Sequence, residues 1–501
     1  MRTGKEQRAM KRYNEKGSAL IFAMIFVLVL SVMAVSLMFL SQSETWASLN
    51  YRMMTQVRYG AEASVNATAN YLMNPPGCVG CYVPPAGFTG INQNSANPVT
   101  DPGGNPIVLS SIQGIASNYP DAGTVGTFSA ATTNTVQAPS GPHMTNNPSV
   151  NYTASATLLS MAQITPFGQT NPVMVQTWQI TARGDMPYVR NAETEVSAIL
   201  EQPIYPAFSY AAFATGNGCG ALSFGGGGTT NSYDSGALPV IGGVATPPTS
   251  FNNYGGNVGT NGNQTDAGSQ TTVNGTLSTP NIGFGVCSGS NVTALSANSK
   301  SQVTGGFVEM PAPFSPPPPV MPAPGTININ NSAILPQCNP TCNYNYGDIS
   351  LSGTQVVTLT PGTYNINSIS ESGQSLVRIA PDPVTGLYGP VILNVTGNNQ
   401  TTPINLVGQG IGNPTLDPSL FQINYAGTGQ IKLVGGAANA AVVYAPNATA
   451  KFAGGGDFYG SIIVGSITDF GGASIHYDLK LKRKLFNVGN WILSSFSWNK
   501  F

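Results

Sequence analysis

The chain has 501 residues, a formal net charge of −1 and only 8% charged residues. It is longer than one ordinary domain, and its balanced charge excludes global attraction of nucleic acid or of an acidic substrate. Gly and Pro are abundant, at 59 and 38 residues, but Val, Ile, Leu, Phe and Tyr fall in short runs, which favours short strands over a disordered tract.

A basic leader precedes a long apolar run. Residues 1–17 hold Arg2, Lys5, Arg8, Lys11, Arg12 and Lys16, and the run from Ser18 to Leu40 has no charge. About 20 apolar residues span a bilayer as a helix, and the basic side is expected to stay inside, with the rest of the chain outside. The run exceeds the core of about 7–15 residues in an ordinary signal peptide. An uncleaved anchor and a processed prepilin leader are the two interpretations.

The junction around Lys16, Gly17 and Ser18 resembles the cleavage site of type IV prepilins. That resemblance implies that a prepilin peptidase cuts between Gly17 and Ser18, and that the apolar helix later packs in a fibre. The family usually carries Glu at the fifth mature position, where this chain has Phe22. Because that Glu pairs with a neighbouring subunit's terminus in major pilins, the resemblance implies an initiating or tip subunit here.

The helix is predicted to continue to residue 73. Apolar residues recur at a spacing of three to four after Ser41, and the run Asn74-Pro75-Pro76-Gly77 ends the pattern. The stretch 59–63, Tyr-Gly-Ala-Glu-Ala, resembles PilX-type minor pilins. This resemblance implies three kinds of partner: other minor and major pilin subunits, the prepilin peptidase and the inner membrane. The assembly would be a type IV pilus or a related secretion pseudopilus.

Residues 74–202 are expected to form loops and a small antiparallel sheet. Residues 74–147 are rich in Pro, Gly, Asn and Thr, with one short helix or strand near Ile107–Ile115. Three segments, 149–158, 173–184 and 193–201, alternate apolar and polar residues, which indicates half-buried strands. The sequence that ends at Gly184 resembles a minor-pilin strand that stops at Gly before a hairpin.

Beyond residue 202 the fold class is predicted to be mainly β, with a large solenoid-like β-helix. Residues 203–309 and 326–501 show short apolar islands between Gly, Asn and Ser, as stacked coils require, and a Pro-rich crossing at 310–325 separates them. Two near-repeats, starting at Ala441 and Ser461, are offset by about 20 residues, one plausible coil. The Pro-Gly-Thr-Tyr at 361–364 and the segments 457–460 and 476–478 resemble β-helix regions of pilus-associated, PilX-type proteins. A strand at 491–496 is expected to close the last coil.

Six cysteines form three local groups: Cys78 with Cys81, Cys219 with Cys287, and Cys338 with Cys342. An even count behind an export signal favours disulfides in an oxidising compartment. A zinc site built from the first and last groups is the alternative, but no His lies near either group. We therefore predict disulfides or free thiols, no metal and no cofactor.

One cluster is a candidate catalytic site: Asp457, His476 and Asp478. Glycoside hydrolysis needs two carboxylates about 5–10 Å apart, and adjacent coils could bring these together. The favoured interpretation is that both Asp side chains accept hydrogen bonds from turn amides and that His476 packs on a ladder. The predicted function is thus a non-enzymatic subunit that primes or caps a pilus and displays its β-helix to a surface polysaccharide or to a host or abiotic surface. No nucleic-acid partner is expected.

The protein is predicted to lie in the inner membrane before assembly and at the pilus tip or cell surface afterwards. The alternative is a standalone, membrane-anchored surface adhesin or polysaccharide-acting β-helix enzyme.

Overall fold

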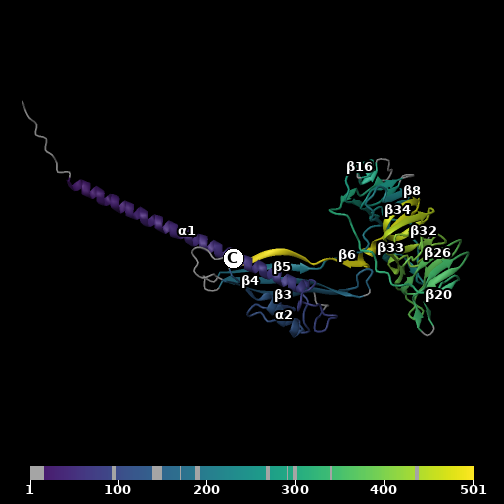
Figure 1. Ribbon diagram of the computed structural model, residues 1–501, viewed down its shortest axis with the longest axis horizontal. Coiled ribbons are helices and arrows are strands. Elements are labelled where there is room, and N and C mark those ends of the chain that lie inside the picture. Colours follow the sequence, from purple (N-terminus) through teal and green to yellow (C-terminus); the bar gives the residue numbers. More distant parts are fainter. Residues whose placement is uncertain are drawn as a thin grey trace, which may run out of the picture. The chain divides into compact units, whose positions relative to one another are not determined.

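The computed structural model describes residues 16–500 except 93–97, 138–148, 170, 187–191, 267–270, 290, 297–301, 339–340 and 435–438. The chain divides into two compact units (Figure 1). The helix–sheet unit comprises Met1–Gln163, Met174–Pro203 and Asn490–Phe501, and the parallel-strand unit comprises Ile164–Val173 and Ile204–Gly489. The predicted coarse class, a long N-terminal apolar helix followed by a mostly β body, is confirmed.

Helix α1 spans Lys16–Met73 without interruption. It ends where the sequence predicts, because Asn74 adopts a left-handed conformation with φ of 47° and two prolines follow. Within the apolar half, the hydroxyls of Ser31 and Ser36 donate to the carbonyl oxygens four residues before them, at 2.7 and 2.8 Å. These two hydroxyls are therefore satisfied inside the helix itself.

The helix–sheet unit contains one sheet in the order β1-β3-β4-β5-β37, with β2 beside β3. Its strands are β1 (Val108–Ser110), β2 (Asn134–Gln137), β3 (Ser149–Ile164), β4 (Val173–Met186), β5 (Ala192–Glu201) and β37 (Ile492–Lys500). The three segments predicted as strands are confirmed. The prediction of loops with one element near residue 110 is incomplete, because α2 (Ala122–Thr132) follows, with Asp121 accepting from the backbone N–H groups of Gly123 and Thr124.

The C-terminal strand corrects a prediction. The segment 491–496 does not close a coil; β37 pairs antiparallel with β5, from Ile492 opposite Glu201 onward. The guanidinium carbon of Arg58 in α1 lies 4.7 Å from the centre of the Trp498 ring. The sheet is therefore completed by residues that follow the whole parallel-strand unit in the sequence.

Gly184 lets α1 approach the sheet closely. A Cβ at this position would lie 2.3 Å from the carbonyl oxygen of Val57 and 2.9 Å from the backbone nitrogen of Ala61. Around this contact Val57, Ala61 and Val65 of α1 are fully buried. The sequence suggested that the strand ends at Gly184. This prediction is wrong, because β4 continues to Met186.

The parallel-strand unit consists mainly of strands two to five residues long. Its largest sheet contains β7 (Ala212–Ala214), β8 (Leu222–Gly225), β9 (Thr229–Tyr233), β12 (Val258–Thr260), β13 (Gln264–Asp266), β14 (Thr272–Val273), β15 (Leu277–Thr279), β16 (Phe284–Gly285), β17 (Leu295–Ser296), β18 (Gln302–Val303), β19 (Phe307–Glu309), β23 (Asp348–Leu351), β25 (Gly362–Ile366), β26 (Ser368–Glu371), β28 (Val391–Val395), β29 (Ile404–Leu406), β31 (Phe421–Tyr425), β32 (Gln430–Val434), β33 (Ala440–Ala453), β34 (Asp457–Gly471) and β35 (Ser474–Asp478). A second parallel sheet contains β20 (Ala333–Leu335), β24 (Val356–Leu359), β27 (Leu376–Ile379) and β30 (Ile411–Gly412).

Three antiparallel pairs complete the unit. They are β6 (Ile204–Pro206) with β36 (Phe486–Val488), β10 (Val240–Ile241) with β11 (Val244–Ala245), and β21 (Gln337–Cys338) with β22 (Cys342–Asn343). Short 3₁₀ turns lie at η1 (Ser235–Ala237), η2 (Pro418–Leu420) and η3 (Leu479–Arg483).

Two ladders of side chains run through the largest sheet. Ladder A contains, rung by rung, Ile329, Ile349, Ile369, Ile404, Ile431, Ala450, Ile467, Leu222, Gln264, Leu295 and Phe284. Ladder B contains Tyr364, Leu393, Ile423, Val443, Ile462, Ala212, Val258, Leu277 and Phe307. Every member except the final Phe of each ladder is buried, so the ladders form the core of this unit.

Both ladders pass through a junction between segments far apart in the sequence. Strand β34 pairs with β7 and β8, and β35 pairs with β9. Residues 212–233 thus lie between strands β34–β35 and strands β12–β14. We call this contact, β34–β35 against β7–β9, the seam.

Gly184→Ala is predicted to destabilise the helix–sheet unit by about 1–3 kcal/mol, because the added carbon meets rigid backbone atoms of α1. All four tryptophans, at 46, 178, 491 and 498, belong to this unit, so tryptophan fluorescence during thermal unfolding reports on it selectively. Gly126→Ala in α2 is the matched control, because no atom lies within 4 Å of its added carbon and Ala favours helix over Gly. Equal melting temperatures for the two variants would contradict the close approach.

Candidate functional site

The N-terminal half of α1 is an exposed apolar surface. No Asp, Glu, Lys or Arg occurs from Ser18 to Ser43, and the most apolar 18-residue window of this helix has a mean hydropathy of 2.9 with none of it buried. This is the one helix in the described part of the chain that is long and apolar enough to cross a membrane. Burial begins at Met53, where the helix meets the sheet. Helix α1 is therefore continuous from an exposed apolar rod, Ser18–Ser43, to a second half that packs on the sheet of the helix–sheet unit (Figure 1).

The predicted processing residues lie at the start of this rod. Gly17 and Ser18 fall in the first turn of α1. The Phe22 side chain is 72% exposed, so the position that would hold a carboxylate instead presents an aromatic ring. The limits of a membrane span at Ser18 and Leu40, and cleavage at Gly17, stay predictions, because the helix runs through both limits without a break.

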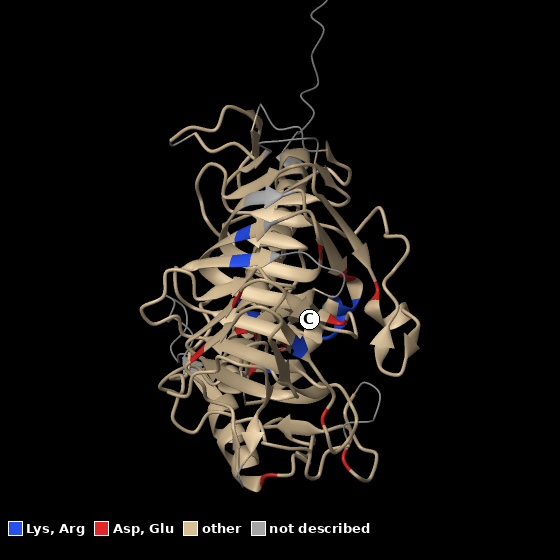
Figure 2. Cartoon of the chain, turned by 90° about the vertical axis from the view of Figure 1, so that its right-hand side faces the viewer, with Lys and Arg blue, Asp and Glu red and all other residues tan. Residues whose placement is uncertain are grey.

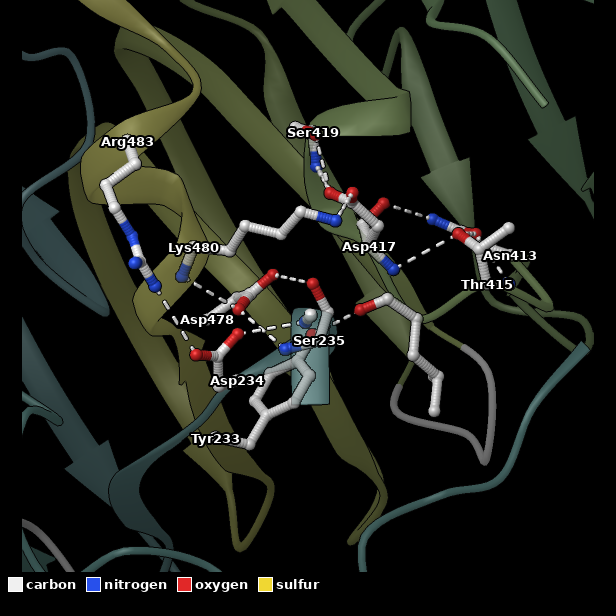
Figure 3. Close-up of polar contacts among 12 residues, drawn as sticks. Tyr233, Asp234, Ser235, Asn413, Thr415, Asp417, Ser419, Asp478, Lys480 and Arg483 are labelled. Carbon is white, nitrogen blue, oxygen red and sulfur yellow. Dashed lines mark hydrogen bonds and ion pairs between the residues drawn. The ribbon is translucent and has the colours of Figure 1, made fainter. Parts of the chain in front are cut away.

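The seam contains a polar cluster built on Asp478 (Figure 3). This buried carboxylate accepts from the backbone N–H groups of Ser235 and Lys480, both at 3.0 Å, and from the Ser235 hydroxyl at 2.6 Å. Burial raises its pKa to about 6, although these hydrogen bonds lower it. Asp478 therefore ties the end of β35 to the turn after β9, the role in turn hydrogen bonding that the sequence favours.

Two ion pairs extend this cluster. Lys480 Nζ lies 2.7 Å from Asp417 Oδ2, and Arg483 lies 3.5 Å from Asp234 (Figure 3). The second Asp417 oxygen accepts from the backbone N–H and hydroxyl of Ser419. Three segments, near residues 234, 417 and 480, are thus joined by charge-assisted hydrogen bonds, which are stronger than neutral ones.

The proposed carboxylate pair is not brought together. Asp457 lies opposite Ser474 in the β34–β35 register, four residues before Asp478, which is about 13 Å along a strand. Asp457 faces His476 instead, with Oδ1 3.2 Å from Nε2. The His476 ring stacks on Phe251 at 3.7 Å, and its Nδ1 contacts the side-chain oxygen of Asn231. His476 is buried in packing contacts, and the arrangement of the two carboxylates gives no support to a glycosidase.

The six cysteines lie in three bonded pairs: Cys78–Cys81, Cys219–Cys287 and Cys338–Cys342. The second pair links positions 68 residues apart, and so joins the turn before β8 to the segment after β16. Within the described residues, no group of three or more His, Cys, Asp or Glu side chains could hold a metal ion.

One buried carboxyl was not singled out from the sequence. Glu371, at the end of β26, has no exposed surface, and its Oε2 accepts from the backbone N–H of Gly410 at 3.1 Å. Burial raises its pKa to about 8. The signal was present in the alternation of β26, because Glu371 follows the inward-facing Ile369 by two positions.

The comparisons with known proteins give two family matches. Residues 16–66 match the family described as PilX N-terminal, which confirms the resemblance to PilX-type minor pilins drawn from the leader and helix. Residues 347–484 match a domain of unknown function, DUF7305. The competence-associated pilin ComZ from Thermus thermophilus is a structural match at 14% identity, covering 89% of this chain and 97% of that one, with a TM-score of 0.24. No curated protein matches the chain.

Asp478→Ala is predicted to destabilise the parallel-strand unit by about 2–4 kcal/mol, because the buried N–H of Ser235 loses its acceptor. Asp478→Asn is the matched control: its side-chain oxygen can still accept from both N–H groups while its amide donates to the Ser235 hydroxyl. Hydrogen exchange of the amides at 229–236 measures the difference. Equal exchange in the two variants would show that the carboxylate does not hold the seam.

A second prediction concerns pH. The folded-state pKa of Glu371, about 8, exceeds its ordinary value of 4.5, so the folded protein holds a proton that the unfolded chain releases. The contribution of Glu371 to stability is therefore greatest at low pH and falls as pH rises from about 5 to 8, by roughly 3–4 kcal/mol. Calorimetric melting at several pH values should show this decline. Glu371→Gln should remove most of this decline, including all of the part above pH 6, and leave only the smaller contribution of Asp478 below pH 6; an unchanged decline would contradict the assignment.

Proposed function

We propose that this chain is a minor pilin-like subunit that enters a type IV pilus, or a related secretion pseudopilus, through α1. The observation that carries this proposal is the division of α1 into two halves: one charge-free and exposed, the other packed on a small sheet. An apolar helix of this kind is stable in a bilayer and equally in a bundle of similar helices. The PilX N-terminal match over 16–66 supports the same role.

Phe22 supports a position at an end of the fibre. A subunit inside a pilus must neutralise the terminal amine of its neighbour, and the rod from Ser18 to Ser43 offers no carboxylate for this. A subunit at an end of the fibre has no such requirement on one side. We therefore assign the chain a priming or capping place. Before assembly, the basic leader keeps the N-terminus in the cytoplasm and the head outside the inner membrane.

The parallel-strand unit is proposed to be a β-helix displayed by this subunit. Support comes from the two buried ladders and from a third, polar ladder of Asn345, Asn365, Asn394 and Asn424, whose side chains hydrogen-bond in sequence at 2.7, 3.0 and 3.1 Å. Such ladders arise when coils stack in register. A unit of this bulk is better suited to the end of a fibre than to every subunit along it. At the end, it could meet a surface polysaccharide or a host or abiotic surface.

Amino-terminal sequencing of the mature protein tests the assembly role, with Ser18 expected as the first residue. Gly17→Val should leave the leader attached, whereas Ser18→Ala, which keeps a small residue after the cut, should still be processed. Cells that lack the protein should have fewer or shorter pili. An intact Met1 on the wild-type protein would overturn the pilin role, and normal fibres in the deletion strain would remove the priming role.

A further inference from the structure

Ladders A and B both end on an exposed phenylalanine. Phe284 is 63% exposed and Phe307 is 56% exposed, although the ladder members directly beneath them, Leu295 and Leu277, are buried. Their positions in the register face the core, so their exposure arises because no further rung lies over them. Ile282 and Val286, beside Phe284, are also exposed, at 71% and 70%.

The opposite end of the ladders differs. Ladder A begins at Ile329, which is 6% exposed, and ladder B begins at Tyr364, which is fully buried with the Tyr344 ring 5.2 Å away. The chain therefore covers one end of its core with its own side chains and leaves the other uncovered. We call the uncovered surface, Ile282–Val286 with Phe307 and Val308, the open end.

The backbone at the open end is unpaired on one side. Among the described strands, the residue registers pair β19 only with β15 and β16 only with β17. An edge of this kind offers free N–H and C=O groups to a further strand. The Cys219–Cys287 disulfide ties the segment after β16 to the turn before β8, which holds the edge in place.

We propose that the open end binds an extended strand of another protein, uncharged and with apolar side chains at alternate positions. The requirement for an uncharged strand follows from the surface, because Glu309, at the end of β19, is the one Asp, Glu, Lys or Arg among the described residues from 271 to 309. Charged residues are also sparse over the rest of this unit (Figure 2). A charged strand would lose its water here without gaining a partner.

The seam shows that this unit already accepts a rung from a remote segment. Strands β34 and β35 cover β7–β9 although Asp478 and Ser235 are 243 positions apart. The open end presents the same kind of surface, a parallel edge above inward-facing apolar residues. The bound strand would continue ladders A and B by one rung.

A fluorescent peptide copying residues 271–279 is a suitable probe. In the chain these residues form the rung directly beneath β18 and β19, with Val273 and Leu277 facing the core. Fluorescence anisotropy with the full chain in detergent should show saturable binding. Phe307→Ser and Phe284→Ser should each weaken it at least tenfold, and a peptide with Asp in place of Leu277 should not bind.

Val384→Ser is the matched control, since Val384 is 90% exposed and belongs to neither ladder. Absence of saturable binding to the wild-type chain would overturn the proposal, as would equal weakening by the control variant. Sedimentation that shows a wild-type dimer, lost in Phe307→Ser, would also overturn it and assign the open end to a second copy of this chain. Unchanged melting of both Phe variants separates lost binding from lost folding, and the two positions lie on different ladders.

Discussion

The parallel-strand unit depends on the seam between β34–β35 and β7–β9. In a stack of short strands each rung is stabilised mainly by its neighbours. The strands β7–β9, which begin the stacked part of residues 204–309, have β12–β14 on one side, and the seam supplies their neighbours on the other side. Ile462 opposite Ala212 and Ile467 opposite Leu222 continue the two buried ladders across it. The apolar contact alone would tolerate a slip of two residues along the strand, whereas the polar contacts of Asp478 with Ser235 and of His476 with Asn231 fix the register. A buried carboxyl is costly, and its raised pKa reflects that cost, so its contribution is specificity of pairing together with the bonds it accepts.

The same seam explains the Pro-rich segment. If the last coil of the later segment must lie beneath the first coil of the earlier one, the chain has to return along the full length of the stack between them. Ladder A has eleven rungs, and its ten steps of about 4.8 Å cover roughly 48 Å. An extended chain at about 3.1 Å per residue covers roughly 50 Å in the 16 residues from 310 to 325. The return passes Phe213, whose ring centre lies 5.0 Å from that of Phe314, and Tyr444, whose hydroxyl donates to the carbonyl of Pro317. Proline keeps such a segment extended and, having no N–H, prevents it from pairing with the edges it passes.

Much of the helix–sheet unit could be predicted because its signals are local. The apolar run, the breaker at Asn74 and three alternating segments specify α1 and β3–β5 within a few residues. Helix α2 was missed because its Gly- and Thr-rich sequence buries only Phe128 and Thr132, too little to give a periodic pattern. The pairing of β37 with β5 and the seam were missed for another reason: an apolar strand does not encode its partner when that partner lies hundreds of residues away. At the candidate site the sequence placed Asp478 correctly among turn amides, but the partner Ser235 and the buried Glu371 depend on tertiary contacts that alternation alone does not reveal.

The order of the chain also links the two units covalently in a way that matters for assembly. The parallel-strand unit is inserted between β5 and β37, and residues 164–173 between β3 and β4 also belong to it. During synthesis, the helix–sheet unit therefore lacks its outer strand β37 until the whole inserted unit has been synthesised. The edge of β5 stays unpaired until then. Strand β37 then reaches α1 directly through Trp498 and Arg58. Because the second half of α1 packs on the same sheet, the stability of the surface that holds α1 depends on β37, which follows the parallel-strand unit in the sequence. A chain that ends within the parallel-strand unit would lack β37, so α1 is held by a complete sheet only after the whole parallel-strand unit has been synthesised.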